Sequence, residues 1–204
     1  MNKINYDAEM NKVISGLEGK KSLLLHSCCA PCSTACLERL TPYFAVPVFY
    51  FNPNSTESEE YYLRLNEQKK FLSEVYGESV KLIEGRYKSA EFFALSKGLE
   101  KIPEGGERCH KCYEARLSET AAVAKQSGFD YFCTTLSVSP YKNAEWINAI
   151  GKSLSESYGV KFLPSDFKKQ NGYRRSVELS EKYGLYRQNY CGCIYSKYER
   201  LVED

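Results

Sequence analysis

Six of the nine cysteines in this 204-residue chain fall in three tight pairs. The pairs are Cys28-Cys29, Cys109-x-x-Cys112 and Cys191-Gly-Cys193. Thiolates at such spacings act as metal ligands in intracellular proteins and form disulfides in secreted ones. Six thiolates exceed the four that one tetrahedral zinc ion or one cubane iron–sulfur cluster requires. The pattern therefore indicates a cluster with a second metal ion, or a cluster with additional reactive thiols.

The redox state that we expect for these thiols follows from the rest of the sequence. The first seven residues carry no charged-then-apolar signal sequence, and no apolar stretch approaches the roughly 18 residues of a membrane span. An odd number of cysteines also leaves one thiol over in any scheme of disulfides. We therefore expect a cytoplasmic protein with reduced thiols and no membrane partner, and metal binding rather than disulfide bonding.

Each pair has local features that suit a metal. Cys109 and Cys112 lie three residues apart near an expected helix start, so both would face one side and the helix N-terminus would favour their thiolates. The glycine between Cys191 and Cys193 lets the backbone pass close to a bulky inorganic group. The adjacent cysteines of the first pair point in opposite directions in an extended chain and thus serve two centres.

The remaining cysteines and the two histidines carry less information. Cys32 lies on the same turn as the first pair and is a candidate ligand, or else a packing residue. Cys36 and Cys133 are expected to be buried apolar residues, because free cysteine is among the most buried residue types. We expect His26 to be a buried, hydrogen-bonded histidine and His110 to be a surface residue.

The charge and the aromatic content of the chain indicate whether it could bind nucleic acid. With 28 basic and 26 acidic residues the formal net charge is +2, which argues against a general nucleic-acid coating protein but allows local basic patches. Several of the seventeen tyrosines stand beside arginines, an arrangement that suits stacking on unpaired bases and contact with phosphate, although ordinary packing explains it equally well. The candidate substrate-binding residues are Lys142, Tyr173, Arg174, Arg175 and Arg187.

The elements that position these residues alternate between strand and helix patterns. The expected strands are Ser22–His26, Val46–Phe51, Val80–Ile83, Asp130–Thr134 and Val160–Leu163. The expected helices are Ala35–Leu40 (continuing from Pro31), Ser58–Tyr76, Cys112–Ser127 and Ala144–Tyr158, with further helix from about Gly172 that breaks at Cys-Gly-Cys.

This alternation predicts an α/β fold, a Rossmann-like parallel sheet of about five strands with helices on both faces. Such sheets bind ligands beyond the carboxyl ends of their strands, so the first cysteine pair and the segment 134–137 would share one rim. We expect a single domain over residues 1–204, with the core over about 1–170. A helical extension over about 171–204 would carry the Cys-Gly-Cys pair.

Four blocks of the sequence, in the same order, resemble the signature blocks of the epoxyqueuosine reductase QueH family. They span nearly the whole chain, and the arrangement of three cysteine pairs is specific to that family. The blocks are HSCCAPC (26–32), ERCHKCY (107–113) with RL (116–117), TTLSVSPYK (134–142) and LYRQNYCGC (185–193).

The resemblance implies a reaction and its cofactors. Members convert epoxyqueuosine to queuosine at the wobble position of tRNAs with a GUN anticodon, without cobalamin. A 4Fe–4S cluster and an adjacent metal ion, iron or zinc, are held by cysteines, and some relatives carry an aspartate where this chain has Cys32. The ligands that the resemblance implies here are Cys28, Cys29, Cys32, Cys109, Cys112, Cys191 and Cys193. Loss of an exposed cluster in air would leave these cysteines as disulfides or bound to zinc.

The expected chemistry is a two-electron reductive deoxygenation that draws on an unidentified electron donor and an unidentified proton donor. A thiol–disulfide oxidoreductase using Cys109 and Cys112 is one alternative, although it leaves two pairs unexplained. A zinc-stabilised RNA-binding module without catalysis is another. A tRNA-thiolating enzyme of related fold would need a phosphate-binding loop after the first strand, where this chain has Cys-Cys-Ala-Pro.

Overall fold

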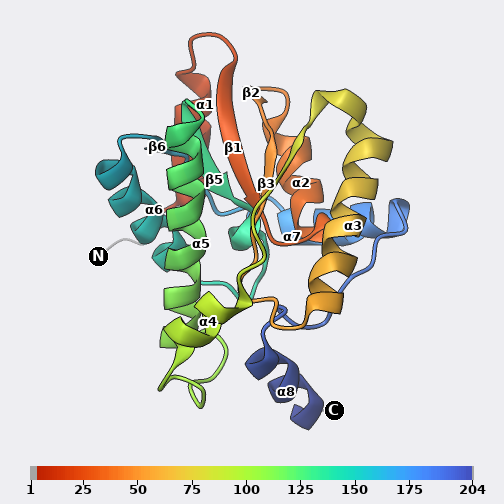
Figure 1. Ribbon diagram of the computed structural model, residues 1–204. Coiled ribbons are helices and arrows are strands. Elements are labelled where there is room, and N and C mark those ends of the chain that lie inside the picture. Colours follow the sequence, from red (N-terminus) through yellow and green to blue (C-terminus); the bar gives the residue numbers. More distant parts are fainter. Residues whose placement is uncertain (1–3, 204) are drawn as a thin grey trace.

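The structure, a computed structural model, describes residues 4–203 (Figure 1). Its strands are β1 (Lys21–Ser27), β2 (Phe44–Ala45), β3 (Val48–Tyr50), β4 (Leu82–Glu84), β5 (Tyr131–Thr134) and β6 (Lys161–Phe162). Its α-helices are α1 (Tyr6–Ser15), α2 (Ala30–Leu40), α3 (Ser58–Tyr76), α4 (Ser89–Ser96), α5 (Glu107–Gln126), α6 (Ala144–Tyr158), α7 (Gly172–Lys182) and α8 (Ile194–Glu203).

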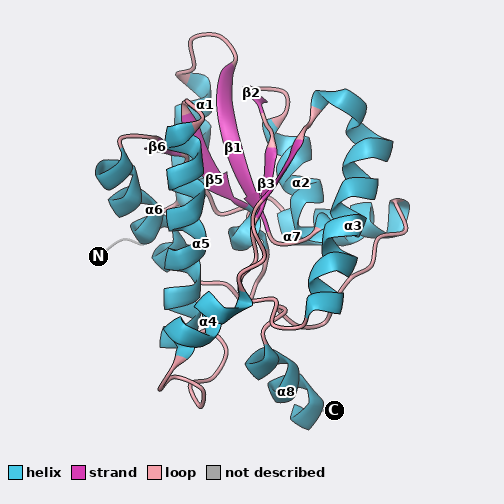
Figure 2. Cartoon of the chain, in the orientation of Figure 1, coloured by secondary structure: helices cyan, strands magenta, loops and turns pink. Residues whose placement is uncertain are grey.

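The strands form one parallel sheet in the order β4-β3-β1-β5-β6, and the short β2 pairs with the start of β1 (Figure 2). The chain builds the sheet outward from β1 on one side and then returns to add β5 on the other side. The predicted α/β fold with a parallel sheet is therefore confirmed. The place where the strand order reverses lies between β1 and β5, and such switch points are where parallel α/β sheets bind ligands.

Helices cover both faces of the sheet, and the side chains of β1 alternate between the two cores that result. Leu23 and Leu25 belong to a core with α1, α2 and α3, whereas Leu24 belongs to a second core with α5 and α6. α7 packs against α2, on the first of these faces. A run of apolar residues that is buried on both sides is what a central parallel strand requires.

Several boundaries differ from the predictions for identifiable reasons. The predicted strand Val46–Phe51 is shorter in the structure, where β3 begins at Val48, because Pro47 has no N–H to donate and offers only its carbonyl oxygen, to Leu25 N–H at 3.0 Å. α5 begins at Glu107 rather than Cys112, with Gly106 as its N-cap. The helices α1 and α4 were not predicted, although Asn5 caps α1 by accepting a hydrogen bond from Ala8 N–H at 3.2 Å.

The carboxyl ends of the central strands all open on the same rim. β1 runs into Cys28, β3 into Asn52 and β5 into the 3₁₀ turn Thr135–Val138. α4 and α8 lie beyond this end of the sheet (Figure 1). No helix within residues 4–203 combines the length and apolar character needed to cross a bilayer.

Candidate metal centre

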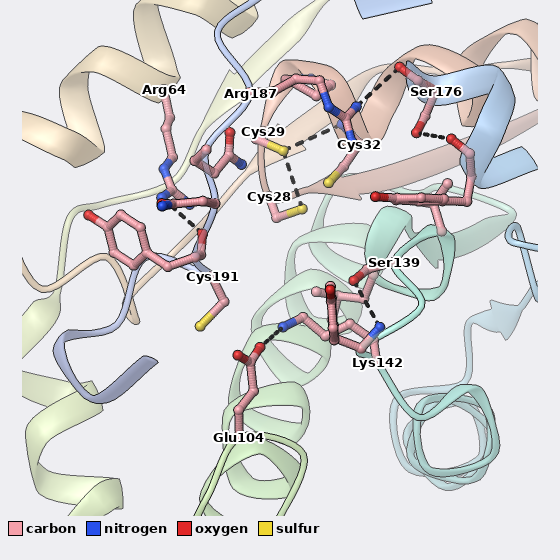
Figure 3. A pocket seen from close by; sticks show the side chains of 18 of the residues that line it. Cys28, Cys29, Cys32, Arg64, Glu104, Ser139, Lys142, Ser176, Arg187 and Cys191 are labelled. Carbon is pink, nitrogen blue, oxygen red and sulfur yellow. Dashed lines mark hydrogen bonds and ion pairs between the residues drawn. The ribbon is translucent and has the colours of Figure 1, made fainter. Parts of the chain in front are cut away.

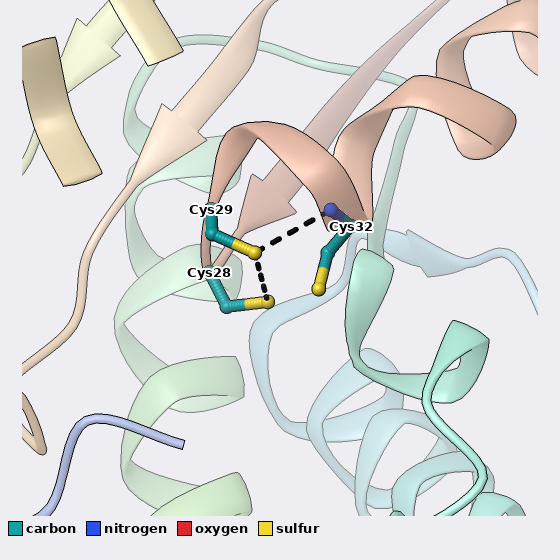
Figure 4. A group of neighbouring side chains, drawn as sticks. All are labelled: Cys28, Cys29 and Cys32. Atoms are coloured by element: carbon teal, nitrogen blue, oxygen red, sulfur yellow. Dashed lines mark hydrogen bonds between the residues drawn. The ribbon is translucent and has the colours of Figure 1, made fainter. Parts of the chain in front are cut away.

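The first group of thiols stands at the junction of β1 and α2. The sulfur atoms of Cys28, Cys29 and Cys32 all lie within 4.8 Å of one another (Figure 4). The sulfurs of Cys28 and Cys29 are 3.8 Å apart. Three converging thiol ligands at this separation can hold a metal ion. We call these three residues the strand thiols.

The start of α2 favours negative charge on the strand thiols. Cys29 is the N-cap, and its sulfur accepts a hydrogen bond from Cys32 N–H at 3.4 Å. Hydrogen bonds from the thiols of Cys29 and Cys32, helped by Arg116, hold the pKa of Cys28 well below its usual range despite burial. Burial, followed by the contact with Cys28, raises the pKa of Cys29 to about 12. Without a metal, the group thus keeps its negative charge chiefly on Cys28.

A second group of four thiols lines a small neighbouring cavity. Cys109 and Cys112 come from the first turns of α5, and Cys191 and Cys193 come from the turn that leads into α8. The sulfurs of Cys191 and Cys193 are 3.5 Å apart. We call these four residues the helix thiols.

Backbone donors point at the helix thiols as well. The sulfur of Cys109 accepts from Gly105 N–H at 3.3 Å, and the sulfur of Cys193 accepts from Ser196 N–H at 3.4 Å. Together with α2, the helices α5 and α8 thus begin at the site. Helix N-termini stabilise thiolates and bound anionic groups. Burial acts against this in the metal-free site, where it raises the pKa of Cys109 and raises the pKa of Cys112 to about 11.

The glycine of the Cys-Gly-Cys turn is required by its surroundings. Gly192 has a φ of +102°, which L side chains rarely adopt. A Cβ atom at this position would stand 2.9 Å from Ser55 Oγ and 3.0 Å from Arg64 Nη1. Protein atoms alone therefore require a glycine here, and the closeness of this turn to an inorganic group stays a prediction.

The two groups of thiols adjoin. Cys191, Arg116 and Lys142 line both the small cavity and a larger one of about 130 Å³, whose wall also includes the strand thiols (Figure 3). The structure therefore brings all seven cysteines that were candidate ligands to the rim of the sheet. They form two neighbouring groups rather than one continuous cluster.

Lys142 is a buried cation in this site. Its side chain is only 9 % exposed, and its Nζ lies 3.4 Å from Glu104 Oε1 (Figure 3). Burial lowers the pKa of Lys142, but the thiol of Cys191, the phenol of Tyr113 and the carboxylate of Glu104 outweigh burial and leave it above its usual value. Lys142 therefore stays charged, facing the helix thiols rather than solvent.

Three pairs of arginine and tyrosine surround the larger cavity. The guanidinium carbon lies 5.1, 5.9 and 4.8 Å from the ring centre in the pairs Arg64–Tyr190, Arg187–Tyr173 and Arg200–Tyr141, respectively. All six residues line the cavity. Flat aromatic and guanidinium surfaces of this kind can stack on nucleobases.

The residues expected to bind substrate divide between two places. Lys142, Tyr173 and Arg187 line the larger cavity. Arg174 and Arg175 lie on the exposed face of α7, outside the cavity lining, in ion pairs with Glu178 and Glu38, respectively.

Sequence reasoning missed several members of the site. Arg116 stood in a quoted sequence block without a role, and Glu104 gave no signal because its partners are distant in sequence. Tyr190 stood in the block LYRQNYCGC without a role. The signal available for Arg116 and Tyr190 was their place beside a cysteine pair.

The other cysteines and His26 are buried as we expected, and His110 is less exposed than the surface residue that we expected. Cys36 and Cys133 are fully buried in the core. His26 is buried and hydrogen-bonded to Thr134 Oγ1 at 2.8 Å. His110 is half-buried, with its ring against Trp146. All nine cysteines are free thiols.

The chain is similar to known proteins over nearly its whole length. Residues 23–199 match the family model described as epoxyqueuosine reductase QueH. Proteins of that name share 46% identity in Streptococcus pyogenes serotype M1 (95% of this chain, 78% of the relative) and 43% in Staphylococcus epidermidis (98% and 88%). The Thermotoga maritima protein of that name shares 37% (88% and 92%). This chain belongs to the epoxyqueuosine reductase QueH family.

Proposed function

We propose that the protein reduces epoxyqueuosine to queuosine at the wobble position of tRNAs with a GUN anticodon, without cobalamin. The observation that carries the proposal is the meeting of two groups of thiols at one cavity, in a chain of this family. The reaction breaks both carbon–oxygen bonds of the epoxide, forms a carbon–carbon double bond and releases water. It consumes two protons and two electrons, which come from a separate, unidentified donor. Because tRNA is the substrate, we propose that the protein acts in the cytoplasm.

The donor set fits two metal groups. The four helix thiols match the ligand number of a 4Fe–4S cluster, and the three strand thiols suit an iron or zinc ion with one open position. The hydroxyl group of Tyr113 lines the small cavity and has no hydrogen-bond partner among the described residues, so it is available to a bound group. When bound, a cluster would supply single electrons and an adjacent ion would act as a Lewis acid.

The cavity residues would bind and orient the modified base. The base is unpaired in the anticodon loop, so it can enter the cavity and stack on a tyrosine of the rim. Tyr173 is 40 % exposed and Tyr141 is 60 % exposed, so both rings are open to such contact. The Nζ group of Lys142 can donate a hydrogen bond to an oxygen of the substrate, because its positive charge is maintained by its neighbours.

The exposed arginines would act on the phosphate backbone. Arg174 is 80 % exposed and, among the described residues, pairs with Glu178 of its own helix, so it can exchange that partner for phosphate. Arg175 has both ends of its guanidinium group engaged, by Glu38 at 2.7 Å and Glu178 at 3.3 Å, and so contributes less.

The test is anaerobic purification followed by measurement of iron, acid-labile sulfide and the visible spectrum. Turnover is then measured on tRNA that carries epoxyqueuosine, with the same tRNA carrying guanosine as a control. We expect a coloured protein that converts only the modified tRNA when a low-potential reductant is supplied. Stoichiometric zinc without iron or turnover would instead support a zinc-stabilised RNA-binding module. Disulfide exchange without iron would support a thiol oxidoreductase.

A further inference from the structure

Arg116 is a buried cation that lies between the two groups of thiols. It stands one helical turn after Cys112 on α5 and is only 2 % exposed. Its guanidinium group donates to Asn52 Oδ1, and its Nε lies 3.3 Å from His26 Nε2. Both partners are neutral, because burial, followed by Arg116 itself, lowers the pKa of His26 to about 3.

The lack of a carboxylate partner sets Arg116 apart from the other arginines that are buried to a similar degree. Arg64 pairs with Glu60 at 2.6 Å, and Arg108 pairs with Glu199 at 3.1 Å. Among the described side chains, no carboxylate lies within ion-pair distance of Arg116. An arginine does not lose its proton in proteins, and a buried charge without a counter-charge is strongly unfavourable. The negative charge that balances Arg116 must therefore come from another kind of group.

The thiols are the groups that face it. Arg116 lines both cavities, the larger one with the strand thiols and the smaller one with the helix thiols. Burial lowers the pKa of Arg116, but Cys112, Cys28 and Cys191 outweigh burial and raise it. These three sulfurs belong to both groups, so a single guanidinium group is electrostatically coupled to both sites.

We infer that Arg116 is a positioning residue whose fixed positive charge serves as the shared counter-ion of both thiol groups and of the metal groups they hold. The inference rests on the proposed function only for the identity of those metal groups. A metal ion held by three thiolates and a cluster held by four both carry net negative charge, so a nearby cation stabilises them. Adding an electron increases the negative charge, so the same cation makes the cluster easier to reduce.

The neutral neighbours fit this role. Asn52 Nδ2 donates to the carbonyl oxygen of Ser27 at 3.2 Å, which fixes the amide so that its oxygen faces Arg116. An aspartate at position 52 would neutralise the guanidinium group in place. The variant keeps the size of the side chain but loses the hydrogen bond to the carbonyl oxygen of Ser27, and the charge available to the thiols would be lost.

The experiment compares Arg116→Gln, Arg116→Lys and Asn52→Asp with the wild type. Arg39→Gln is the control, because it removes one positive charge at a partly exposed ion pair with Asp7, away from the cavities. The first measurement is the zinc affinity of the reduced, metal-free protein, by competition with a chromophoric chelator. The second is the melting temperature with and without zinc. The third is the midpoint potential of the reconstituted cluster.

We expect Arg116→Gln and Asn52→Asp to weaken zinc binding about tenfold and to reduce the zinc-induced rise in melting temperature. The cluster should become about tenfold harder to reduce, a shift of about 59 mV toward more negative potential for one electron. Arg116→Lys should retain most of both properties, because it keeps the charge. Arg39→Gln should match the wild type in zinc affinity, in the zinc-induced rise in melting temperature and in midpoint potential, although losing the partner of buried Asp7 lowers its melting temperature with and without zinc alike.

A purely structural role for Arg116 predicts a different result. Arg116→Gln would then lower the melting temperature equally with and without zinc, and zinc affinity and midpoint potential would stay unchanged. That outcome would overturn the inference. If Arg116→Gln fails to fold, the zinc affinities of Asn52→Asp and Arg116→Lys decide the matter in the same way. A wild type that takes up no iron–sulfur cluster would refute the proposed function, whereas the zinc measurements would still report on Arg116.

Discussion

Cys109 and Cys112 are the most direct residues on which to test the metal assignment. Replacing either with serine should remove the cluster and all turnover, because serine is a poor iron ligand and four thiols are available to the cluster. The loss is read from iron content, sulfide content and the visible spectrum.

The controls for this prediction are Cys36→Ala and Cys133→Ser, whose sulfurs lie in the core away from both cavities. Both variants should keep the spectrum and nearly full turnover. Loss of the cluster in either one would contradict the division between core cysteines and site cysteines.

Cys32 is the residue that should separate the two metal groups. We expect Cys32→Ala to keep the cluster and lose the second metal ion, since only two strand thiols would remain. Cys32→Asp should keep the cluster spectrum and part of the turnover, because a carboxylate can also bind a metal ion. Metal analysis of both variants tests the assignment. Full metal content and full turnover in the alanine variant would reduce Cys32 to a packing residue.

His26 should make the metal-free protein sensitive to mild acid. Burial, followed by Arg116, lowers its pKa to about 3 in the folded state, from the usual 6.5. The unfolded chain therefore binds a proton that the folded chain excludes, and the free energy of unfolding falls as pH drops through that window. The slope approaches about 1.4 kcal/mol per pH unit.

The measurement is urea unfolding of the reduced apoprotein between pH 7 and pH 5, above the range where most carboxylates titrate. His26→Gln should show a flatter dependence on pH over the same interval. Equal slopes in the two proteins would show that His26 is not the group responsible.

At the level of single residues, the sequence identified the seven cysteines that gather at the rim of the sheet, because their chemistry is unusual and their spacing is local. Their role as metal ligands stays a prediction. The burial of Cys36, Cys133 and His26 was also predicted correctly. Arg116 and Glu104 were missed because nothing near them in sequence reveals what faces them in the fold. Charge balance in a buried site depends on contacts across the sheet rim, such as that of Arg116 with Asn52.

At the level of elements, helices with clear ends were predicted with the correct bounds. α6 begins after Asn143, whose side chain accepts from two backbone N–H groups, and is followed by the left-handed Gly159. α4 was missed because it is short and its apolar residues do not follow a clear helical spacing. The short β2 was not predicted, and the start of the second strand at Val48 rather than Val46 depends on the hydrogen bonding around Pro47, which a hydrophobic pattern does not report.

The turn between Cys191 and Cys193 gives a prediction about backbone geometry. Gly192→Ala should cost roughly 1–3 kcal/mol of stability and lower the metal content, because a positive φ and close contacts with Ser55 and Arg64 combine there. Urea unfolding and iron analysis measure the two effects.

Gly19→Ala is the matched control, since Gly19 has a φ of +73° but open space around its Cβ position. It should lose stability by roughly 1–2 kcal/mol from backbone strain alone and keep its metal. Equal metal content in the two variants would show that the turn tolerates displacement.

At the level of the whole molecule, the helix thiols connect the C-terminal segment to the core. α8 is otherwise held by ion pairs, including Glu199 with Arg108 at 3.1 Å and Lys197 with Glu57 at 2.7 Å, and by the ring of Tyr195 against Phe92. Removing the metal with a chelator should therefore speed amide hydrogen exchange in residues 191–201, while β1 and β5 stay protected. Mass spectrometry of peptide fragments measures both regions in one experiment. Uniform loss of protection would instead indicate that the metal supports the entire fold.

The order of the cysteines along the chain has a consequence for how the protein is made. During synthesis the strand thiols leave the ribosome first, whereas the helix thiols are complete only when Cys193 has followed. Nascent chains can therefore meet a soft metal ion at the strand thiols before any four-thiol site exists. The cluster that we propose for the helix thiols can be inserted only after Cys193 has emerged, so the two groups would receive their metals at different times.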